Sequence, residues 1–341
     1  MLTIFLNAFF ISLITSLIVI YLSHKHTFFI DCHEQDKPQK FHDFPVPRAG
    51  GIGILAGLVF LLGTPFGWKL LLSAVLAFIS GIFEDFHNSL SPRVRLLLQI
   101  IAALSVVWVT GAVVTYLGLG ITMPYWVGVL FSIFAIVGMI NAINIIDGFN
   151  GLASGVVLLI LCSFAVVSDA HHNMELLHVL SVVIGATFGF FVLVFPKGKI
   201  FLGDGGAYLL GLIVAVIGIF LAGKYDDVSP WYVLAVLIYP VWEVIFSIIR
   251  KVSKGFSPMK PDNYHMHMLV HRQITRNNPL TALTIIALIS PFVIFSTVYA
   301  NSSKYNMMVS AVFILCYVLL YRYLSQKDRK LYSLNAVNGY R

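Results

Sequence analysis

Two sets of carboxylates lie at the ends of long apolar stretches, where they can meet both water and lipid. Glu84 and Asp85 are adjacent and end one apolar run, and Asp204 lies in the glycine-rich turn 203–206 just before another. Adjacent acids repel one another, which favours binding a magnesium ion or holding a proton. In the glycine-rich turn, backbone N–H groups can face phosphate oxygens while Asp204 holds the accompanying magnesium. For the adjacent acids the alternative is a solvated helix end, and for the glycine-rich turn it is an ordinary turn.

A second polar set recurs at every third position of one apolar stretch. Asn141, Asn144 and Asp147 then lie on one face of a helix, which Gly148 and Gly151 end. Three polar groups in a membrane helix cost free energy unless they are used. The spacing therefore indicates a substrate site, with an interhelical hydrogen-bond ladder as the alternative.

A basic residue precedes the second apolar stretch, and two glycines lie at the start of that stretch. Arg48 is followed by Gly50 and Gly51, so the unpaired N–H groups of a helix start beside a guanidinium predict an anion site. Alternatively, Arg48 only orients the chain in the membrane and the glycines only pack helices.

Histidines mark the longest polar loop. His265 and His267 follow Asp262, and Glu243 lies about two helical turns inside the preceding apolar stretch from Arg250. Two histidines without a thiolate are too few for a zinc site. Hydrogen-bond donation to phosphate is the better functional interpretation, and a plain surface loop is the alternative.

The composition places these residues in a membrane protein. Of the 341 residues 59% are hydrophobic and only 11% are charged, and the mean hydropathy is +0.89. Ordinary soluble domains carry about 25% charged residues. The composition therefore excludes a soluble enzyme, a disordered protein and a nucleic-acid-binding module. The three cysteines are too few and too scattered for a disulfide framework.

The apolar stretches predict an all-α polytopic membrane protein that forms a single domain over residues 1–341. A bilayer crossing needs roughly 20 predominantly apolar residues. Eleven stretches qualify, approximately 2–22, 49–66, 68–83, 95–114, 124–146, 151–168, 175–195, 206–222, 231–249, 279–299 and 306–324. The second and third are short and resemble a helical hairpin.

The charges predict the orientation of the chain. On one side of the membrane lie 19 of the 22 Lys and Arg residues, and the other side holds Lys69, Lys224 and Lys304. The positive-inside rule places the richer side in the cytoplasm, with the N-terminus outside and the C-terminus inside.

The acidic residues follow the same side, which holds 11 of the 15 Asp and Glu. A transporter of a lipid or an anion keeps ionisable residues near the bilayer midplane, and here only Glu243 lies deep in a predicted span. A scaffolding protein gives no reason for clustered polar segments on one face. The pattern favours a site at the cytoplasmic membrane surface, where a water-soluble substrate can meet a lipid.

Together these segments resemble the polyprenyl-phosphate N-acetylhexosamine-1-phosphate transferases (glycosyltransferase family 4), over nearly the whole chain. That family moves a sugar-1-phosphate from a UDP-sugar to a polyprenyl phosphate, releasing UMP. The resemblance implies magnesium as cofactor, with manganese as an alternative. It implies a UDP-amino sugar, polyprenyl phosphate and membrane lipid as partners, no nucleic acid, and allows a homodimer.

The resemblance also implies residue roles. Asp204 matches the magnesium-binding aspartate of an F-x-G-D-x-G motif, and the pair Glu84 and Asp85 matches acids near the metal and the acceptor phosphate. The catalytic set is then Glu84, Asp85, Asp147, His265 and His267. The substrate-binding set is Arg48, Gly50, Gly51, Asn144, Asn150 and Glu243.

Three positions depart from the family pattern. The acidic pair is usually Asp-Asp but has Glu84 first, a second aspartate is replaced by Asn150, and a third histidine is replaced by Met268. These changes indicate a branch that starts O-antigen, capsule or teichoic acid chains in a bacterial inner membrane, with the site facing the cytoplasm. The segment 46–51 reads V-P-R-A-G-G and points away from the alternative, the phospho-MurNAc-pentapeptide transferases, which carry T-P-T-M-G-G there.

Overall fold

The computed structural model describes residues 1–26, 46–87, 91–257 and 262–338. Their regular structure is helical, because a backbone surrounded by lipid must satisfy its N–H and C=O groups within the segment. The helices are α1 Leu2–His26, α2 Gly50–Gly57, η1 Leu58–Gly63, α3 Pro65–His87, α4 Pro92–Thr110, α5 Tyr125–Ile146, α6 Leu152–Ala170, α7 Met174–Val194, α8 Gly203–Lys224, α9 Pro230–Val236, α10 Ile238–Val252, α11 Met266–Val270, η2 His271–Thr275, α12 Asn278–Val298 and α13 Ser303–Asn338. The prediction of an all-helical polytopic membrane protein is confirmed.

Several helix ends follow directly from local sequence. Ser91 accepts a hydrogen bond from the Val94 N–H at the start of α4, and Pro92 occupies the first helical position. The same helix ends early, at Thr110, because Gly111 takes a left-handed conformation that glycine adopts without strain. The predicted span 95–114 therefore extends too far at its end.

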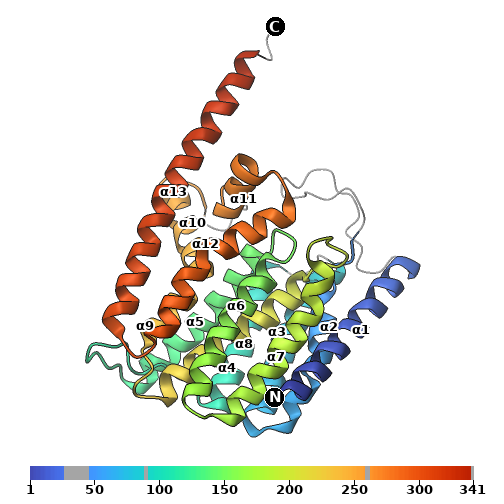
Figure 1. The fold of residues 1–341 in the computed structure, drawn as a ribbon, viewed down its shortest axis with the longest axis vertical. Helices are drawn as coiled ribbons and strands as arrows, with labels where there is room; N and C mark the ends of the chain where they lie inside the picture. The colour runs from blue at the N-terminus through green and yellow to red at the C-terminus, as the bar shows by residue number, and fades with distance from the viewer. Residues whose placement is uncertain (27–45, 88–90, 258–261, 339–341) are drawn as a thin grey trace.

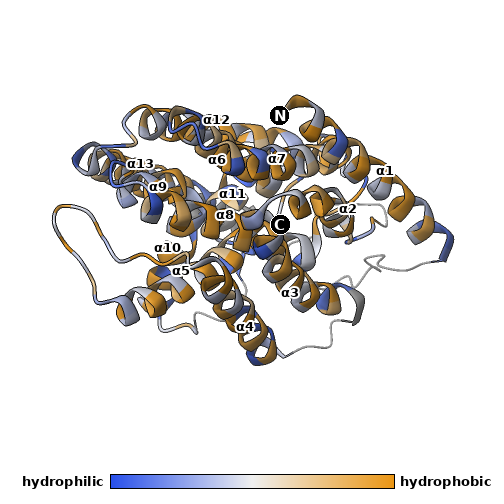
Figure 2. Cartoon of the chain, turned by 90° about the horizontal axis from the view of Figure 1, so that it is seen from below, coloured by the Kyte–Doolittle hydropathy of each residue, from blue (hydrophilic) through white to orange (hydrophobic). Residues whose placement is uncertain are grey.

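Helix α8 is the axis around which the other helices pack. Nearly all of its residues are buried, and it contacts α2, α3, α5 and α6 (Figure 1). The surrounding helices consist predominantly of hydrophobic residues, as the colouring by hydropathy shows (Figure 2). Consequently the first turn of α8, which holds Asp204, lies at one end of the bundle and is framed by the ends of its neighbours.

The number of full-length spans is the main difference from the prediction. Among the described residues nine helices are long and apolar enough to cross a membrane, and α9 with α10, bent by 75°, makes a tenth. The predicted span 49–66 is instead the 14-residue segment α2–η1. It begins beside Phe201, just before α8, and its far end lies beside α7, where the Phe60 carbonyl is 3.1 Å from His178 Nε2. It therefore still connects the two ends of the bundle.

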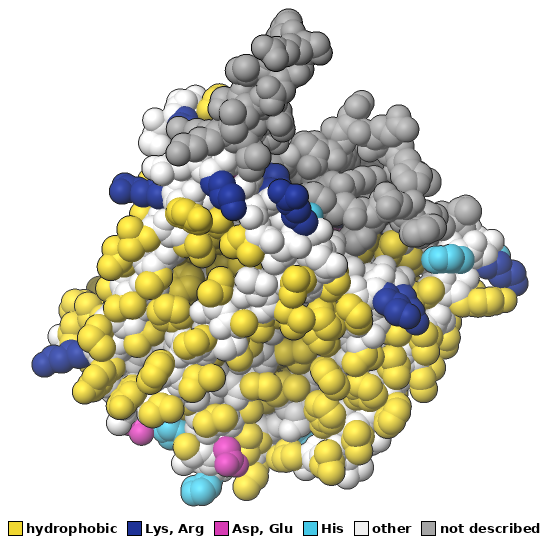
Figure 3. All heavy atoms as spheres, turned by 45° about the horizontal axis from the view of Figure 1, so that its top comes forward, with side chains coloured by type: hydrophobic (Ala, Val, Ile, Leu, Met, Phe, Trp, Pro, Cys, Tyr) yellow, Lys and Arg dark blue, Asp and Glu magenta, His cyan; other side chains and the backbone are white. Residues whose placement is uncertain are grey.

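Most of the visible Lys and Arg side chains lie near one rim of the molecule, and a broad apolar surface lies beside them (Figure 3). Helix α13 continues past this rim, well beyond the predicted end of its span at residue 324 (Figure 1). Cys162 and Cys316 are free thiols, and Cys32 lies outside the described residues.

Candidate active site

Asp85 and Asp204 come from different helices and meet through the backbone. Asp85, near the end of α3, accepts hydrogen bonds from the N–H groups of Asp204 and Gly205, both at 2.9 Å. Because the first N–H groups of a helix lack partners within it, this carboxylate caps α8. The prediction that the turn leaves these N–H groups facing a phosphate is therefore wrong for Asp204 and Gly205.

Gly203 makes this arrangement sterically feasible. Its φ is +75°, and a Cβ there would lie 2.7 Å from Asp85 Oδ2 and 2.8 Å from the Arg48 carbonyl oxygen. Both the conformation and the space require glycine. The turn is thus shaped by packing as well as by charge.

The segment around Arg48 pairs with the approach to α8. Arg48 and Phe201 form an isolated parallel bridge, and the N–H groups of Gly50 and Gly51 donate to the carbonyls of Phe201 and Leu202 at 2.8 and 3.0 Å. The predicted unpaired N–H groups at this helix start are therefore not available for an anion. What the segment brings to the site is the Arg48 side chain, whose charge acts on Asp85 and Asp147.

Asp204 is contacted from three directions. Asn144 Nδ2 donates to its Oδ1 at 3.0 Å, while Arg95 Nη1 and the Tyr208 hydroxyl lie 3.4 and 3.5 Å from its Oδ2. Arg95 Nη1 also lies 3.6 Å from Glu84 Oε1. Arg95 therefore stands between two carboxylates that are far apart in the sequence.

Sequence patterns alone do not identify Arg95 or Tyr208 as site residues. Arg95 looks like a charge that balances the acids at the end of α3, and Tyr208 looks like an apolar helix position. Only the spacing of four between Tyr208 and Asp204, which puts both on one face of α8, is a signal.

The polar residues on one face of α5 have two kinds of partner. Asn141 donates to Gln99 Oε1 on α4 at 2.7 Å, which is the interhelical alternative, whereas Asn144 faces Asp204. Asp147 follows the last residue of α5. Burial raises the pKa of Asp147 to about 7, with Arg48 lowering it and Asp204 raising it.

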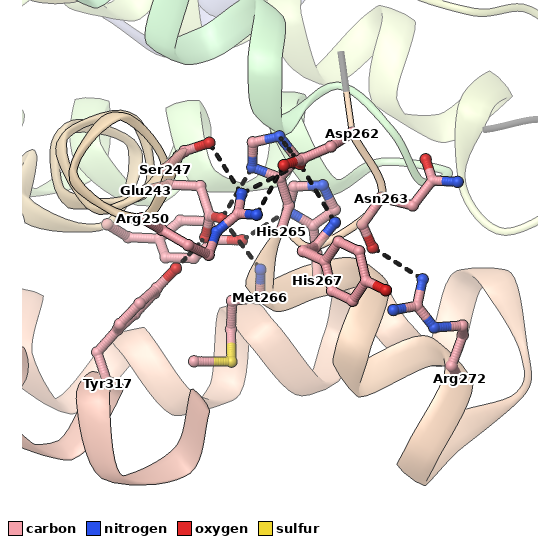
Figure 4. Close-up of polar contacts among 12 residues, drawn as sticks. Glu243, Ser247, Arg250, Asp262, Asn263, His265, Met266, His267, Arg272 and Tyr317 are labelled. Carbon is pink, nitrogen blue, oxygen red and sulfur yellow. Dashed lines mark hydrogen bonds and ion pairs between the residues drawn. The ribbon is translucent and has the colours of Figure 1, made fainter. Parts of the chain in front are cut away.

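Glu243 and His265 form a buried pair (Figure 4). Glu243 is 1% exposed, and its Oε1 accepts from His265 Nδ1 and the Met266 N–H, both at 3.0 Å. Its Oε2 accepts from the Tyr317 hydroxyl of α13 at 2.9 Å. The described contacts of this carboxylate are thus with protein groups that hold the histidine segment.

His267 lies beside the end of α5. It is 1% exposed, its ring meets Phe149 edge-on, and a Cβ on Gly148 would lie 3.6 Å from its Nε2. The end of α5 and the turn after it therefore lie between Asp204 and the histidine segment. Asn144 contacts Asp204, and Gly148 faces His267.

Ion pairs fix the loop that carries these histidines. Asp262 accepts from Arg250 Nη1 and Nη2 at 2.6 and 3.1 Å, and Arg272 donates to the Asn263 carbonyl at 2.8 Å (Figure 4). Arg272 also pairs with Asp328 of α13 at 3.2 Å. The histidine segment is thus tied to both α10 and α13.

Asn150 lies in the turn after α5, where it braces the backbone. Its side-chain Nδ2 donates to the Pro196 carbonyl at 3.0 Å, and its N–H donates to the Asn278 side chain at 2.7 Å. These bonds join the turns before α6 and α8 to the start of α12. The structure thus gives Asn150 protein partners on two sides.

The carboxylates of Asp204 and Glu84 are of the ligand type that Mg²⁺ prefers. Mg²⁺ is usually held by one or two carboxylates, with water and substrate phosphates completing its shell. Asp204 and Glu84 both approach Arg95, and the described residues contain no group of three or more His, Cys, Asp and Glu placed to enclose a metal. A site of this kind would therefore need ligands from its substrate.

The sequence of this chain is similar to those of known proteins. The model of the family described as "Glycosyl transferase family 4" matches residues 68–222. The probable undecaprenyl-phosphate N-acetylglucosaminyl 1-phosphate transferase of Bacillus subtilis is 30% identical, over 76% of this chain and 75% of its own length. This chain belongs to glycosyl transferase family 4. It is accordingly a transferase embedded in the membrane by multiple helices.

Two further relatives carry similar names. The undecaprenyl-phosphate alpha-N-acetylglucosaminyl 1-phosphate transferase of Thermotoga maritima is 28% identical, over 84% of this chain and 88% of its own length. The protein of the same name from Salmonella typhimurium is 27% identical, over 75% and 73%. The family match covers the elements that carry Glu84, Asp85, Asn144, Asp147 and Asp204, whereas Arg48, Glu243 and the histidines lie outside it.

Proposed function

We propose that this family member transfers N-acetylhexosamine-1-phosphate from a UDP-sugar to a polyprenyl phosphate at the cytoplasmic face of a bacterial inner membrane. The observation that carries the proposal is the Asp204 carboxylate, held by Asn144 and Arg95 beside a second acid at one end of the bundle. The similarity to transferases named for N-acetylglucosamine 1-phosphate supports the sugar class.

The reaction joins two anions, so positive charge must separate them. An oxygen of the lipid phosphate attacks the phosphorus that carries the sugar, the bond from that phosphorus to UMP breaks, and UMP leaves with the electron pair. Magnesium, when bound at Asp204, would neutralise the diphosphate and stabilise UMP as the leaving group. Arg48 and the two histidines would donate to oxygens that gain charge.

The two acids after α3 have separate roles in this proposal. Asp85 uses both carboxylate oxygens on the backbone of α8, so it positions Asp204. Glu84 then orients the acceptor phosphate and takes any proton it carries. Because the second pKa of a phosphate monoester is about 6, positioning matters more than base strength. Direct attack by the lipid phosphate is preferred over an aspartyl-phosphate intermediate, the alternative route.

The donor sugar is tested with membranes that contain the overexpressed chain. They are incubated with undecaprenyl phosphate, Mg²⁺ and UDP-GlcNAc, UDP-GalNAc or UDP-MurNAc-pentapeptide, and lipid products are identified by mass alongside released UMP. A product from an N-acetylhexosamine donor is expected. A product from the pentapeptide donor alone would instead favour a phospho-MurNAc-pentapeptide transferase, and no product from any donor would contradict the transfer.

The magnesium assignment is tested with Asp204→Asn. Activity is expected to fall by about 100-fold or more while the protein still inserts, because a neutral amide is a weak Mg²⁺ ligand. Asp226→Asn, in an exposed loop at the other end of α8, is the matched control. Full activity of Asp204→Asn would contradict the assignment.

A further inference from the structure

The break between α9 and α10 presents two side chains to the histidine segment. Tyr239 and Glu243 are four residues apart near the start of α10, so they share one face of that helix. Glu243 bonds His265, and the Tyr239 hydroxyl lies 3.3 Å from Nδ1 of His267. Each histidine thus has its own partner on α10.

The partner of His265 fixes where that ring carries a hydrogen. An ionised carboxylate only accepts hydrogen bonds, and Glu243 already receives the Met266 N–H and the Tyr317 hydroxyl. Nδ1 of His265 therefore donates to Glu243. This is the way in which a carboxylate commonly fixes the tautomer of a histidine.

The partner of His267 acts in the opposite sense. Tyr239 is 3% exposed, and His267 Nδ1 is the hydrogen-bond partner that the structure gives its hydroxyl. If that hydroxyl accepted from Nδ1, its own hydrogen would be buried without an acceptor, at a cost of about 1–3 kcal/mol. The favoured arrangement is donation by Tyr239, which leaves the hydrogen of the neutral ring on Nε2.

His267 Nε2 is buried and has no hydrogen-bond partner within the described part of the chain. Buried polar atoms are nearly always paired, so an orphaned one in a candidate active site points to a ligand. Burial also lowers the pKa of His267 to about 4, and His265 stacks parallel to it at 5.4 Å. His267 is thus a neutral ring at physiological pH.

We propose that Tyr239 is a positioning residue that holds His267 as the Nε2–H tautomer, so that Nε2 donates a hydrogen bond to a phosphate oxygen of the nucleotide-sugar diphosphate. Glu243 and Tyr317 hold the neighbouring His265 with its hydrogen on Nδ1. This inference rests on the proposed function for the identity of the acceptor oxygen. The tautomer itself does not depend on it.

The tautomer is measured by ¹⁵N NMR on protein labelled with ¹⁵N-histidine and reconstituted in lipid nanodiscs. The spectrum of His267→Gln identifies the His267 signals. In the unsubstituted protein Nε2 is expected to be protonated and Nδ1 to be an unprotonated acceptor, and Tyr239→Phe is expected to lose this preference. A hydrogen on Nδ1 in the unsubstituted protein would overturn the proposal.

Kinetics with the UDP-sugar that gives a product test the consequence. Tyr239→Phe keeps the ring but is expected to lower kcat about 10-fold with little change in KM, as loss of an orienting partner does elsewhere. The matched control is Tyr232→Phe, which removes another buried hydroxyl, bonded to Ser163 on α6. Unchanged kcat in Tyr239→Phe, or an equal loss in Tyr232→Phe, would overturn the positioning role.

The two proposals fail in different ways. If the unsubstituted protein shows the Nε2–H tautomer but forms no lipid product from any UDP-sugar, the proposed function fails and the tautomer assignment stands. If a product forms but the hydrogen lies on Nδ1, the function stands and the role of Tyr239 fails.

Discussion

At the scale of single residues, Asp85 illustrates how a carboxylate can shape a site through the backbone of another helix. Both of its oxygens accept hydrogen bonds from backbone N–H groups in the first turn of α8. Asp85 therefore fixes the position of the Asp204 backbone. Adjacent acids in a sequence predict a polar site but not which acid faces outward. The pairing of Asp85 rather than Glu84 with α8 depends on a long-range contact, because Asp204 lies 119 residues further along the chain.

Gly203 gives the sharpest test of this turn. Gly203→Ala is expected to destabilise the protein by about 1–3 kcal/mol and to abolish transfer, because its φ is positive and its Cβ would press on Asp85. Thermal unfolding in detergent and product formation are the measurements. Gly138→Ala on α5, where a Cβ meets nothing within 4 Å, is the control and should resemble the unsubstituted protein. Equal behaviour of the two variants would refute this account.

Asp147 predicts a pH dependence of stability. Its pKa is raised from an ordinary 3.8 to about 7, so the folded protein holds a proton that the unfolded chain loses. Between these values the folded state binds more protons, and stability therefore falls as pH rises from 3.8 to 7. Melting temperatures across this range should fall less steeply for Asp147→Asn. Asp226→Asn, with an exposed acid, should keep the original slope, and parallel slopes for all three proteins would contradict the assignment.

At the scale of elements, hydropathy predicts most of the helices because lipid leaves an apolar run little choice of structure. The predicted span 124–146 differs from α5 by one residue at its start, and the predicted span 175–195 is shifted from α7 by one residue at both ends. The bend between α9 and α10 has a local signal in Pro240, which lacks the N–H that continues a helix. The apolar run 49–66, by contrast, predicts a longer span than α2–η1, whose shortness hydropathy alone does not reveal. The partners of Glu243 show the same limit, since Tyr317 comes from a helix 74 residues away.

The hydrogen bonds of Asn150 couple the turns before α6 and α8 to the start of α12, and a substitution tests how much they stabilise the protein. In Asn150→Asp a carboxylate would replace the amide that donates to the Pro196 carbonyl, leaving two acceptors face to face. A loss of stability of about 1–3 kcal/mol is expected near neutral pH. It should shrink at acidic pH, where a protonated carboxyl can donate again. Thermal unfolding at both pH values checks this, and a variant as stable as the unsubstituted protein at neutral pH would show that the bond is dispensable.

At the scale of the whole molecule, the distribution of charge predicts orientation. By sequence, 19 of the 22 Lys and Arg residues fall in segments predicted to lie on the same side of the membrane as Asp204, and the positive-inside rule places that side in the cytoplasm. A fluorescent protein fused after residue 341 should therefore fold and fluoresce, whereas alkaline phosphatase fused there should stay inactive. Fusions at the loop that contains Asp226 should behave in the opposite way. An active phosphatase at residue 341 would reverse the predicted topology.

The short α2–η1 segment has a consequence for the lipid around it. Eight α-helical and six 3₁₀ residues span about 24 Å, against a hydrocarbon core of roughly 30 Å. Such hydrophobic mismatch is relieved by local thinning of the bilayer. Since α2 begins beside the turn that leads to Asp204, the headgroup layer would dip toward that carboxylate. A phosphate on a long isoprenoid tail could then reach the acid while its tail stays in the hydrocarbon.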